Sequence, residues 1–362
     1  MPGVFVGLMS GTSLDGIDAV AATFGGTPQL ICSNYQPFAP TLRDDLLALQ
    51  APGDNELHRA AIAANQLAHA YAAVVTALLQ AASLQPRDVE AIGCHGQTVR
   101  HRPDAGYTTQ LVNGALLAEL TGIRVITDFR SRDIAAGGQG APLVPAFHHR
   151  VFHSGKEHRV IVNIGGIANI TNLPSVGAET GFDCGSGNAL MDGWIAGHRA
   201  QPYDAQGAWA ASGKVVPALF AALFSDPYFS LLPPKSTGRD LFNRAWLEAA
   251  LHGDEAPQDV QATLLELTAQ AIAQAINRHC AGAQAVFVCG GGAHNLALMA
   301  RLAVLLPECR VSDTQALGID ADWVEALAFA WLAQQAVLGK PGNLPGVTGA
   351  RGPRILGAIY PV

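Results

Sequence analysis

Short apolar runs alternate along the chain with longer, alanine-rich stretches. Apolar runs of about four to eight residues between glycine or polar residues predict strands, while apolar residues repeated at helical spacing predict helices. We expect strands at 4–9, 17–24, 89–93, 124–127, 160–164, 167–173 and 285–289. We expect helices at about 56–82, 114–122, 258–280, 295–306 and 322–339. This alternation predicts an α/β fold.

The opening pattern returns in the second half of the chain. The first two strands enclose a turn of small polar residues at 10–16, and the strands at 160–173 enclose Gly165 and Gly166. Each set reads as a β-hairpin, so the chain is predicted to contain two related halves. We expect domains at 1–130 and 131–345, an insertion rich in proline, glycine and aromatic residues at about 202–246, and a tail at 346–362 that returns to the first domain.

Three further stretches carry local predictions. Residues 128–142 (DFRSRDIAAGGQGAP) are polar and glycine-rich, and long irregular segments in compact domains are often functional. The helix at 258–280 is interpreted as amphipathic. In the last helix, Asp322 and Glu325 have the spacing of a capping box and Gly339 marks the end.

Composition narrows the class of protein. The chain has 362 residues and a formal charge of -7, with 22 basic and 29 acidic side chains. Its length and its 49% hydrophobic content allow two cores. No cluster of basic residues favours nucleic-acid binding. Polar residues interrupt the apolar stretches and the N-terminus lacks a basic leader, so we expect no membrane span and a cytoplasmic location.

Cysteine and histidine spacing does not favour a metal module. The six cysteines lie far apart without a CxxC pair, which argues against a disulfide framework or zinc module. The dense histidine group comprises His148, His149, His153 and His158. We interpret it as a solvated helix end, because no cysteine or carboxylate trio nearby completes a metal shell.

Three glycine-rich turns each follow an apolar run. They are LMSGTSLDGID (8–18), GFDCGSGN (181–188) and VCGGGAHN (288–295). Glycine lets backbone amides approach a phosphate and hydroxyls add donors. Any one of them alone could equally be an ordinary bend, but three in two related halves favour a bound nucleotide. A Walker P-loop, a dinucleotide-binding GxGxxG and a serine-hydrolase GxSxG are all absent from the sequence.

Carboxylates accompany two of these turns. Asp183 follows Phe182 at the mouth of the second turn, where a base could deprotonate a nucleophile near a γ-phosphate. The alternative is an aspartate that caps its own turn. Asp15 and Asp18 in the first turn could hold Mg²⁺, although capping of the hairpin explains them equally well.

Several longer strings together resemble one enzyme family. They are GLMSGTSLDGID (7–18), GCHGQT (93–98), TDFRSRDIAAGGQGAPLVPAFH (127–148), NIGGIANIT (163–171), GFDCGSGN (181–188), PPKSTGRDLF (233–242) and CGGGAHN (289–295). The chain resembles the bacterial anhydro-N-acetylmuramic acid kinases over nearly its whole length. The resemblance implies two duplicated actin-like (ribonuclease H-like) domains around a central ATP cleft. It also implies conversion of 1,6-anhydro-N-acetylmuramic acid, ATP and water to N-acetylmuramic acid 6-phosphate and ADP in cell-wall recycling, with Mg²⁺. From the same resemblance we expect a homodimer.

The resemblance also assigns roles to residues. Asp183 matches the base that would activate water. The residues expected at ATP are Gly11, Thr12, Ser13, Leu14, Asp15, Gly16, Ile17, Asp18, Gly165, Gly166, Gly185, Gly290, Gly291 and Gly292. Those expected at the sugar are His95, Gln97 and Arg130. Arg130 suits the lactyl carboxylate, but an ion pair with Asp128 or Asp133 is the alternative.

The first loop departs from the pattern of the wider superfamily at one position. Many relatives in the wider superfamily carry Asp two residues before the Gly-Thr of the first loop, where this chain has Met9. The usual metal anchor is therefore missing at that position. Of the two carboxylates in the first turn, Asp15 is our expected magnesium ligand. A related hexose kinase that does not hydrolyse a ring, or a non-catalytic nucleotide switch of the same fold, would need the same three turns.

Overall fold

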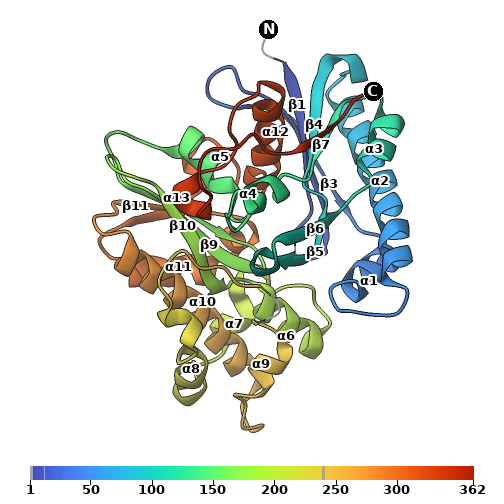
Figure 1. Cartoon of the computed structure of the whole chain (residues 1–362). Helices are drawn as coiled ribbons and strands as arrows, with labels where there is room; N and C mark the ends of the chain where they lie inside the picture. The colour runs from blue at the N-terminus through green and yellow to red at the C-terminus, as the bar shows by residue number, and fades with distance from the viewer. Residues whose placement is uncertain (1–2, 12, 239–240) are drawn as a thin grey trace. The chain divides into compact units, whose positions relative to one another are not determined.

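The computed structural model describes residues 3–11, 13–238 and 241–362, which divide into two compact units (Figure 1). The first unit is Met1–Val151 with Trp323–Val362, and the second is Phe152–Asp322. The break thus follows Val151, whereas we placed it after residue 130. The first unit also takes back the chain from Trp323 onwards, earlier than the predicted return at 346, because the helix that follows packs on its sheet.

A six-stranded sheet forms the centre of the first unit, in the order β13-β7-β4-β1-β2-β3. Its strands are β1 (Val4–Met9), β2 (Gly16–Thr23), β3 (Gln29–Pro37), β4 (Val89–Cys94), β7 (Val125–Thr127) and β13 (Ala358–Tyr360). The first three strands form an antiparallel meander, and β4 and β7 continue the sheet in parallel with β1. The tail supplies β13, antiparallel to β7. A separate hairpin joins β5 (Gln97–Arg102) to β6 (Tyr107–Leu111).

Helices cover both faces of this sheet. They are α1 (Pro40–Ala48), α2 (Glu56–Ala81), α3 (Gly114–Thr121), α4 (Ser131–Ala135), α5 (Val144–Phe152), α12 (Val324–Val337) and α13 (Pro345–Thr348). Figure 1 shows α2 and α3 on one side of the sheet and α12 on the other. Val6 and Leu8 belong to the core that α2 covers, whereas Gly7 between them faces α12, as the alternation of side chains along a strand requires.

Two glycines let α12 lie very close to the sheet. A Cβ atom on Gly7 would overlap the carbonyl oxygen of Ala326, and one on Gly93 would overlap that of Phe329. Only residues without a side chain allow this approach. Among the described residues, α2 is the one helix long and apolar enough to cross a membrane by length and composition, and its buried face forms part of the core of the first unit.

The second unit repeats the topology of the first. Its five-stranded sheet has the order β10-β9-β8-β11-β12. The strands are β8 (Arg159–Ile164), β9 (Ile167–Leu173), β10 (Thr180–Ser186), β11 (Ala285–Cys289) and β12 (Arg310–Asp313). As in the first unit, a three-stranded antiparallel meander is followed by two strands parallel to its first strand. This common order confirms the predicted repeat.

One long helix lies at the centre of the second unit. The helices are α6 (Ala189–Arg199), α7 (Ala208–Ser212), α8 (Pro217–Phe224), α9 (Arg244–Glu248), α10 (Pro257–His279) and α11 (Leu296–Leu305). Because α6, α7, α8 and α11 all contact α10, its polar residues Gln261, Thr263 and Glu266 are buried. The amphipathic interpretation of this helix was therefore wrong. The segment at 202–246 forms short helices, two of which pack on α10.

The predicted capping box at the start of α12 was also wrong. The helix begins at Val324, and Trp323 occupies the N-cap position without a side-chain cap. Asp322 instead accepts a hydrogen bond from His294 Nε2 at 2.7 Å. The predicted end is confirmed, since Gly339 has a φ of +65° directly after the helix.

Candidate active site

The turn after β1 in the first unit rests on buried hydroxyl groups. Ser10 is fully buried, and its Oγ donates a hydrogen bond to the carbonyl oxygen of Gly96 at 3.1 Å. Since Ser10 has one hydroxyl proton, the Tyr71 hydroxyl at 2.7 Å must donate to Ser10 Oγ. Burial raises the pKa of Tyr71 well above its ordinary value, so this donor keeps its proton. Thr12 lies outside the described residues.

Within the turn, some predicted phosphate contacts already have protein partners. Leu14 adopts a left-handed φ of 59°, buries its side chain in the core and donates its N–H to the Gly11 carbonyl at 3.3 Å. Asp15 Oδ1 accepts hydrogen bonds from Ser13 Oγ at 2.6 Å and Gly16 N at 3.1 Å. This arrangement supports the capping interpretation of Asp15, while Gly11, Ser13 and Asp15 keep exposed surface.

The last two predicted residues of this loop belong to β2. Ile17 is fully buried, so only its backbone could reach a ligand. Asp18 is partly exposed and lies opposite Met9 in the ladder between β1 and β2. Met9 itself is buried and brings no oxygen ligand to this end of the strand. Asp18 is therefore the carboxylate that the ladder places opposite Met9.

The three predicted sugar residues of the first unit lie together behind this turn. Gln97 is fully buried and its Nε2 donates to the Gly11 carbonyl at 3.1 Å. His95 Nε2 accepts hydrogen bonds from Arg130 Nε at 3.2 Å and Nη2 at 2.9 Å. The Arg130 guanidinium also donates from Nη1 to the Gly140 carbonyl at 2.8 Å. One connected network therefore links Arg130, His95 and the turn.

His95 is a neutral hydrogen-bond acceptor in this network. Burial, and after it the Arg130 charge, lowers the pKa of His95 to about 3. With Nε2 accepting from Arg130, the proton resides on Nδ1, which donates to the Ser10 carbonyl at 3.3 Å. Both ring nitrogens therefore have protein partners, and His95 orients Arg130 from one side.

The alternative partners of Arg130 are bound elsewhere. Asp128 Oδ1 accepts a hydrogen bond from the Ser131 hydroxyl at 2.5 Å. Asp133 is fully buried and Oδ2 accepts the Gly140 N–H at 2.8 Å. Both carboxylates therefore accept hydrogen bonds from neutral groups, and neither is paired with Arg130 in the contacts described.

In the second unit, the predicted glycine turns converge at the end of β8. The Gly165 carbonyl accepts the Asn188 N–H at 2.8 Å, and the Gly166 carbonyl accepts the N–H groups of Gly187 and Ala189 at 3.0 and 3.2 Å. Gly187 must lack a side chain, because a Cβ atom would overlap the Gly165 oxygen. These bonds fix the turn between β8 and β9 against the start of α6.

The third glycine turn packs against the same strand end. A Cβ atom on Gly290 would lie 2.5 Å from Asn163 Oδ1, and one on Gly292 would overlap Ile164. Gly291 is the exposed member of the three, with room for a Cβ at 3.6 Å from Asn188 Nδ2. Close packing therefore accounts for Gly290 and Gly292, and Gly291 presents backbone to solvent.

Asp183 lies on an irregular part of β10. The register with β9 shifts between Asp183 and Gly185, as in a β-bulge. Gly185 is buried there, and a Cβ atom would lie 2.8 Å from Phe229, so packing explains this glycine too. Asp183 is partly exposed between the buried Phe182 and Cys184. The bulge is therefore the part of β10 at which a partly exposed carboxylate lies between two buried residues.

A distant loop holds Asp183 by three hydrogen bonds. Thr237 N donates to Asp183 Oδ2 at 3.0 Å, Asp183 N donates to the Lys235 carbonyl at 3.2 Å, and Tyr228 Oη donates to the Asp183 carbonyl at 2.7 Å. Burial raises the pKa of Tyr228, which keeps it a donor. Lys235 Nζ lies 4.5 Å from the centre of the Tyr228 ring. These contacts favour a positioned carboxylate over a cap of its own turn.

Sequence reasoning did not single out Tyr71, Tyr228 or Thr237. Tyr71 lies within the helix expected at about 56–82 and carries no further signal of its own. Thr237 lies in the PPKSTGRDLF string, whose small and polar residues at 233–242 were the available signal. Tyr228 carried no local signal, because an aromatic residue in a proline-rich segment is ordinary core material.

The described histidines and carboxylates do not form a metal cluster. No group of three or more His, Cys, Asp or Glu side chains suited to a metal occurs among the residues that were searched, which exclude 1–2, 12 and 239–240. His148 is fully buried, His153 Nε2 contacts the Pro174 carbonyl and His158 Nε2 contacts Asn172 Oδ1. The dense group in the sequence therefore spreads over separate surroundings.

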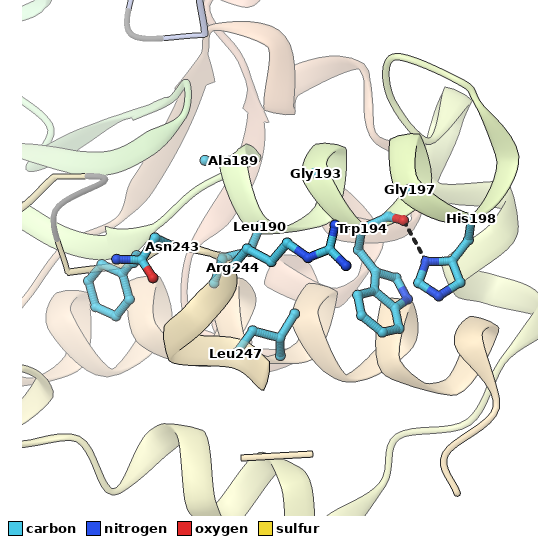
Figure 2. A pocket seen from close by; sticks show the side chains of 10 residues that line it. Ala189, Leu190, Gly193, Trp194, Gly197, His198, Asn243, Arg244 and Leu247 are labelled. Carbon is cyan, nitrogen blue, oxygen red and sulfur yellow. Dashed lines mark hydrogen bonds between the residues drawn. The ribbon is translucent and has the colours of Figure 1, made fainter. Parts of the chain in front are cut away.

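A cavity of about 290 Å³ lies beside α6 and α9 in the second unit. Figure 2 shows Trp194 and His198 side by side, with ring centres 4.0 Å apart. Gly193 and Gly197 leave the facing side of α6 bare. The lining residues are Ala189, Leu190, Gly193, Trp194, Gly197, His198, Phe242, Asn243, Arg244 and Leu247. None of the predicted site residues lines this cavity.

Known proteins match the chain over its whole length. The family model for anhydro-N-acetylmuramic acid kinase matches residues 3–362. The protein of that name from Nitrosospira multiformis is 59% identical over 360 residues, covering 99% of this chain and 98% of the relative. The one from Nitrosomonas europaea is 57% identical over 360 residues, with 99% of each chain covered.

A solved structure bears on the fold. Component A of the (R)-2-hydroxyglutaryl-CoA dehydratase from Acidaminococcus fermentans superposes with a TM-score of 0.50 at 12% identity, covering 91% of this chain and 96% of that one. At this identity the likeness concerns the fold alone. The two units have the predicted duplicated actin-like α/β fold. Full-length identity well above half and the matching family model together establish that the chain belongs to the anhydro-N-acetylmuramic acid kinase family.

Proposed function

We propose that this chain is an ATP-dependent kinase that opens the 1,6-anhydro ring of 1,6-anhydro-N-acetylmuramic acid with water and phosphorylates O6. The products are N-acetylmuramic acid 6-phosphate and ADP, and the role is recycling of cell-wall sugars. Membership of the family supports the reaction. The observation that carries the proposal is the Asp183 carboxylate, partly exposed on a strand bulge and held by the Thr237 N–H at 3.0 Å.

The chemistry needs one base. Water attacks C1 of the sugar and gives its proton to Asp183, while the bond from C1 to O6 breaks. The departing O6 bonds to the γ-phosphorus of ATP, and the bond between that phosphorus and the β,γ-bridging oxygen breaks to release ADP. An inverting glycosidase needs a second carboxyl group as acid for its leaving group. Here phosphoryl transfer to O6 takes that role.

ATP contacts are proposed for the glycine turns of each unit. In the first unit, we assign them chiefly to the accessible backbone of Gly11, Ser13 and Asp15, because the N–H groups of Leu14 and Gly16 have protein partners. In the second unit, we assign them to the turn at Gly165 and Gly166 and to the exposed Gly291. Gly185, Gly290 and Gly292 would support these turns through close packing.

The sugar contact is proposed for Arg130. Its guanidinium suits the lactyl carboxylate of the sugar, because charge-assisted hydrogen bonds to carboxylates are short and strong. His95 would orient this guanidinium as a neutral acceptor, and Gln97 would hold the loop through the Gly11 carbonyl. In this proposal Arg130 binds the substrate and the other two residues act through their neighbours.

Magnesium is proposed to bind at Asp15. Its exposed carboxylate uses Oδ1 for Ser13 and Gly16, and Oδ2 accepts no hydrogen bond from the rest of the described chain. Mg²⁺ in nucleotide sites usually takes one or two carboxylates, phosphate oxygens and water, which a single open carboxylate oxygen fits. When bound, the ion would supply charge neutralisation at the phosphates.

Product mass tests the proposed reaction. The purified protein is incubated with ATP, Mg²⁺ and the anhydrosugar, and the expected product is heavier by one phosphoryl group and one water. A product heavier by the phosphoryl group alone would refute coupled ring opening. Phosphorylation of ordinary hexoses at a comparable rate would favour the hexose kinase, and binding of ATP without any product would favour the nucleotide switch. The Asp183→Asn variant serves as the inactive control.

A further inference from the structure

The loop that carries Arg130 is tied to the end of the chain by one buried carboxylate. Asp133 lies in α4 and is 0% exposed. Its Oδ1 accepts hydrogen bonds from Asn343 Nδ2 at 2.7 Å and Thr348 Oγ1 at 2.8 Å. Its Oδ2 accepts the Gly140 N–H at 2.8 Å. All four residues belong to the first unit.

Only a carboxylate satisfies this arrangement. Three donors point at the Asp133 side chain, and an ionised carboxylate is the acceptor-only group with two oxygens. An asparagine would keep one oxygen and turn its NH₂ group towards a donor. Burial of a carboxylate is tolerated when hydrogen bonds compensate for lost water. The site is therefore built for an aspartate.

Gly140 connects this carboxylate to Arg130. Its N–H donates to Asp133, and its carbonyl accepts the Arg130 Nη1–H at 2.8 Å. Gly140 has a left-handed φ of +67°, and a Cβ atom there would lie 2.7 Å from Ile134. The position of the Asp133 carboxylate therefore fixes Gly140, and the carbonyl of Gly140 in turn holds the Arg130 guanidinium.

The partners of Asp133 are themselves fixed. Asn343 Oδ1 accepts the Arg354 N–H at 2.7 Å. The Thr348 carbonyl accepts the Gln139 N–H at 2.7 Å, and Arg351 N donates to the Ala136 carbonyl at 2.9 Å. The segment after α12 is therefore hydrogen-bonded along the whole loop that follows Arg130.

We infer that Asp133, held by Asn343 and Thr348, is a positioning residue that places Arg130 for the substrate carboxylate. This inference rests on the proposed function, in which Arg130 binds that carboxylate. Asp133 touches no reacting atom, so its removal should raise the KM for the sugar while kcat and the KM for ATP change little. The effect should also vanish once Arg130 is gone.

A double-mutant cycle tests this dependence. The variants are Asp133→Asn, Arg130→Ala and the double variant, assayed for sugar KM, ATP KM and kcat. We expect Asp133→Asn to raise the sugar KM about tenfold, the size of one displaced charge-assisted contact. The double variant should have the sugar KM of Arg130→Ala, because residues that act through one another are not additive.

Thr348 provides a second route if Asp133→Asn fails to fold. Thr348→Val removes one donor at constant shape and should raise the sugar KM about threefold, while Thr348→Ser keeps the hydroxyl and should restore it. The matched control is Thr121→Val. It removes a hydroxyl that donates to the Leu117 carbonyl at 2.8 Å and accepts the Ile123 N–H at 3.3 Å, and it should not alter the sugar KM.

The outcomes separate this inference from the proposed function. If the wild-type protein turns over the anhydrosugar but Asp133→Asn and Thr348→Val leave the sugar KM unchanged, the inference is wrong and the proposed function stands. Additive effects in the double variant, or lower stability without a change in KM, would also overturn it. No turnover by the wild-type protein would overturn both.

Discussion

Two buried histidines should make the first unit sensitive to acid. Burial lowers the pKa of His148 to about 3, and burial together with Arg130 lowers the pKa of His95 to about 3. In the unfolded chain a histidine binds its proton near pH 6.5. As pH falls below about 6.5, the unfolded state gains protons that the folded state cannot bind until about pH 3. The contribution of the two neutral rings to stability is therefore fully present above about pH 6.5 and is lost as the pH falls towards 3.

The size of the effect follows from the two pKa values. One pKa unit corresponds to about 1.36 kcal/mol. A pH of 5 lies about one and a half units below the pKa of a histidine in the unfolded chain. Each buried ring should therefore lower the free energy of unfolding by about 2 kcal/mol at this pH. Together they should remove about 4 kcal/mol from the free energy of unfolding between pH 7 and pH 5. That is a large share of a typical stability of about 5–15 kcal/mol.

Chemical denaturation at several pH values measures this loss. Urea unfolding is followed by circular dichroism at pH 7, 6 and 5 for the wild-type protein and for His148→Gln, His95→Gln and the exposed control His69→Gln. Each buried-site variant should reduce the loss of unfolding free energy between pH 7 and pH 5 by about 2 kcal/mol. The exposed control shows what the exchange of a surface histidine for glutamine does to the measured unfolding.

Each variant differs from the wild-type protein only at one histidine. A difference between their pH dependences therefore reports that histidine and not the carboxylates. In His95→Gln, the new amide oxygen can still accept from Arg130, so the network keeps an acceptor. An unchanged pH dependence in His148→Gln would refute the reasoning for that ring. An unchanged dependence in both variants would mean that neither histidine is held neutral by burial.

Three further predictions concern catalysis, binding and packing. Asp183→Asn should lower turnover by about 10²–10⁴ while ATP binding by calorimetry is retained, since it removes the base at constant size; near-normal turnover would place the base elsewhere. Arg130→Ala should raise the sugar KM and leave the ATP KM unchanged in steady-state assays, and an unchanged sugar KM would remove its proposed role. Gly93→Ala should cost about 1–3 kcal/mol in urea unfolding, because the new Cβ would overlap the Phe329 carbonyl and lie 3.0 Å from Ala333 Cβ. Gly26→Ala, with nothing within 4 Å, is the matched control and should stay within about 1 kcal/mol of wild type; equal losses would contradict the packing argument.

The fold was predictable where a strand is an apolar-rich run that is buried on both faces. The predicted strands at 4–9, 167–173 and 285–289 are confirmed to the residue. By contrast, β3 was missed because it is an edge strand whose apolar and polar residues are all exposed or half-buried, and it is held by its ladder to β2. The hairpin of β5 and β6 was missed for the same reason, since its residues are largely half-buried and polar.

The glycines show what a local pattern leaves undecided. Glycine allows the backbone to come close either to a phosphate or to another segment of the same protein. Gly187 faces the Gly165 carbonyl and Gly292 faces Ile164, contacts that the sequence alone does not separate from contacts with a ligand. Gly291 is exposed between two packed neighbours. Close packing does not explain this glycine, so a contact with phosphate stays its predicted role.

The partners of the site residues are harder to predict, because they come from distant parts of the chain. Thr237 is 54 residues from Asp183, and Thr348 is 215 residues from Asp133. No local periodicity records such pairs, since each depends on which segments the sheets bring together. The strings at 127–148 and 233–242 each contain a residue that holds a proposed site residue: Gly140 contacts Arg130, and Thr237 contacts Asp183. In the first string, Arg130, Asp133 and Gly140 form one continuous set of hydrogen bonds, so exchanging any one of them should disturb the other two.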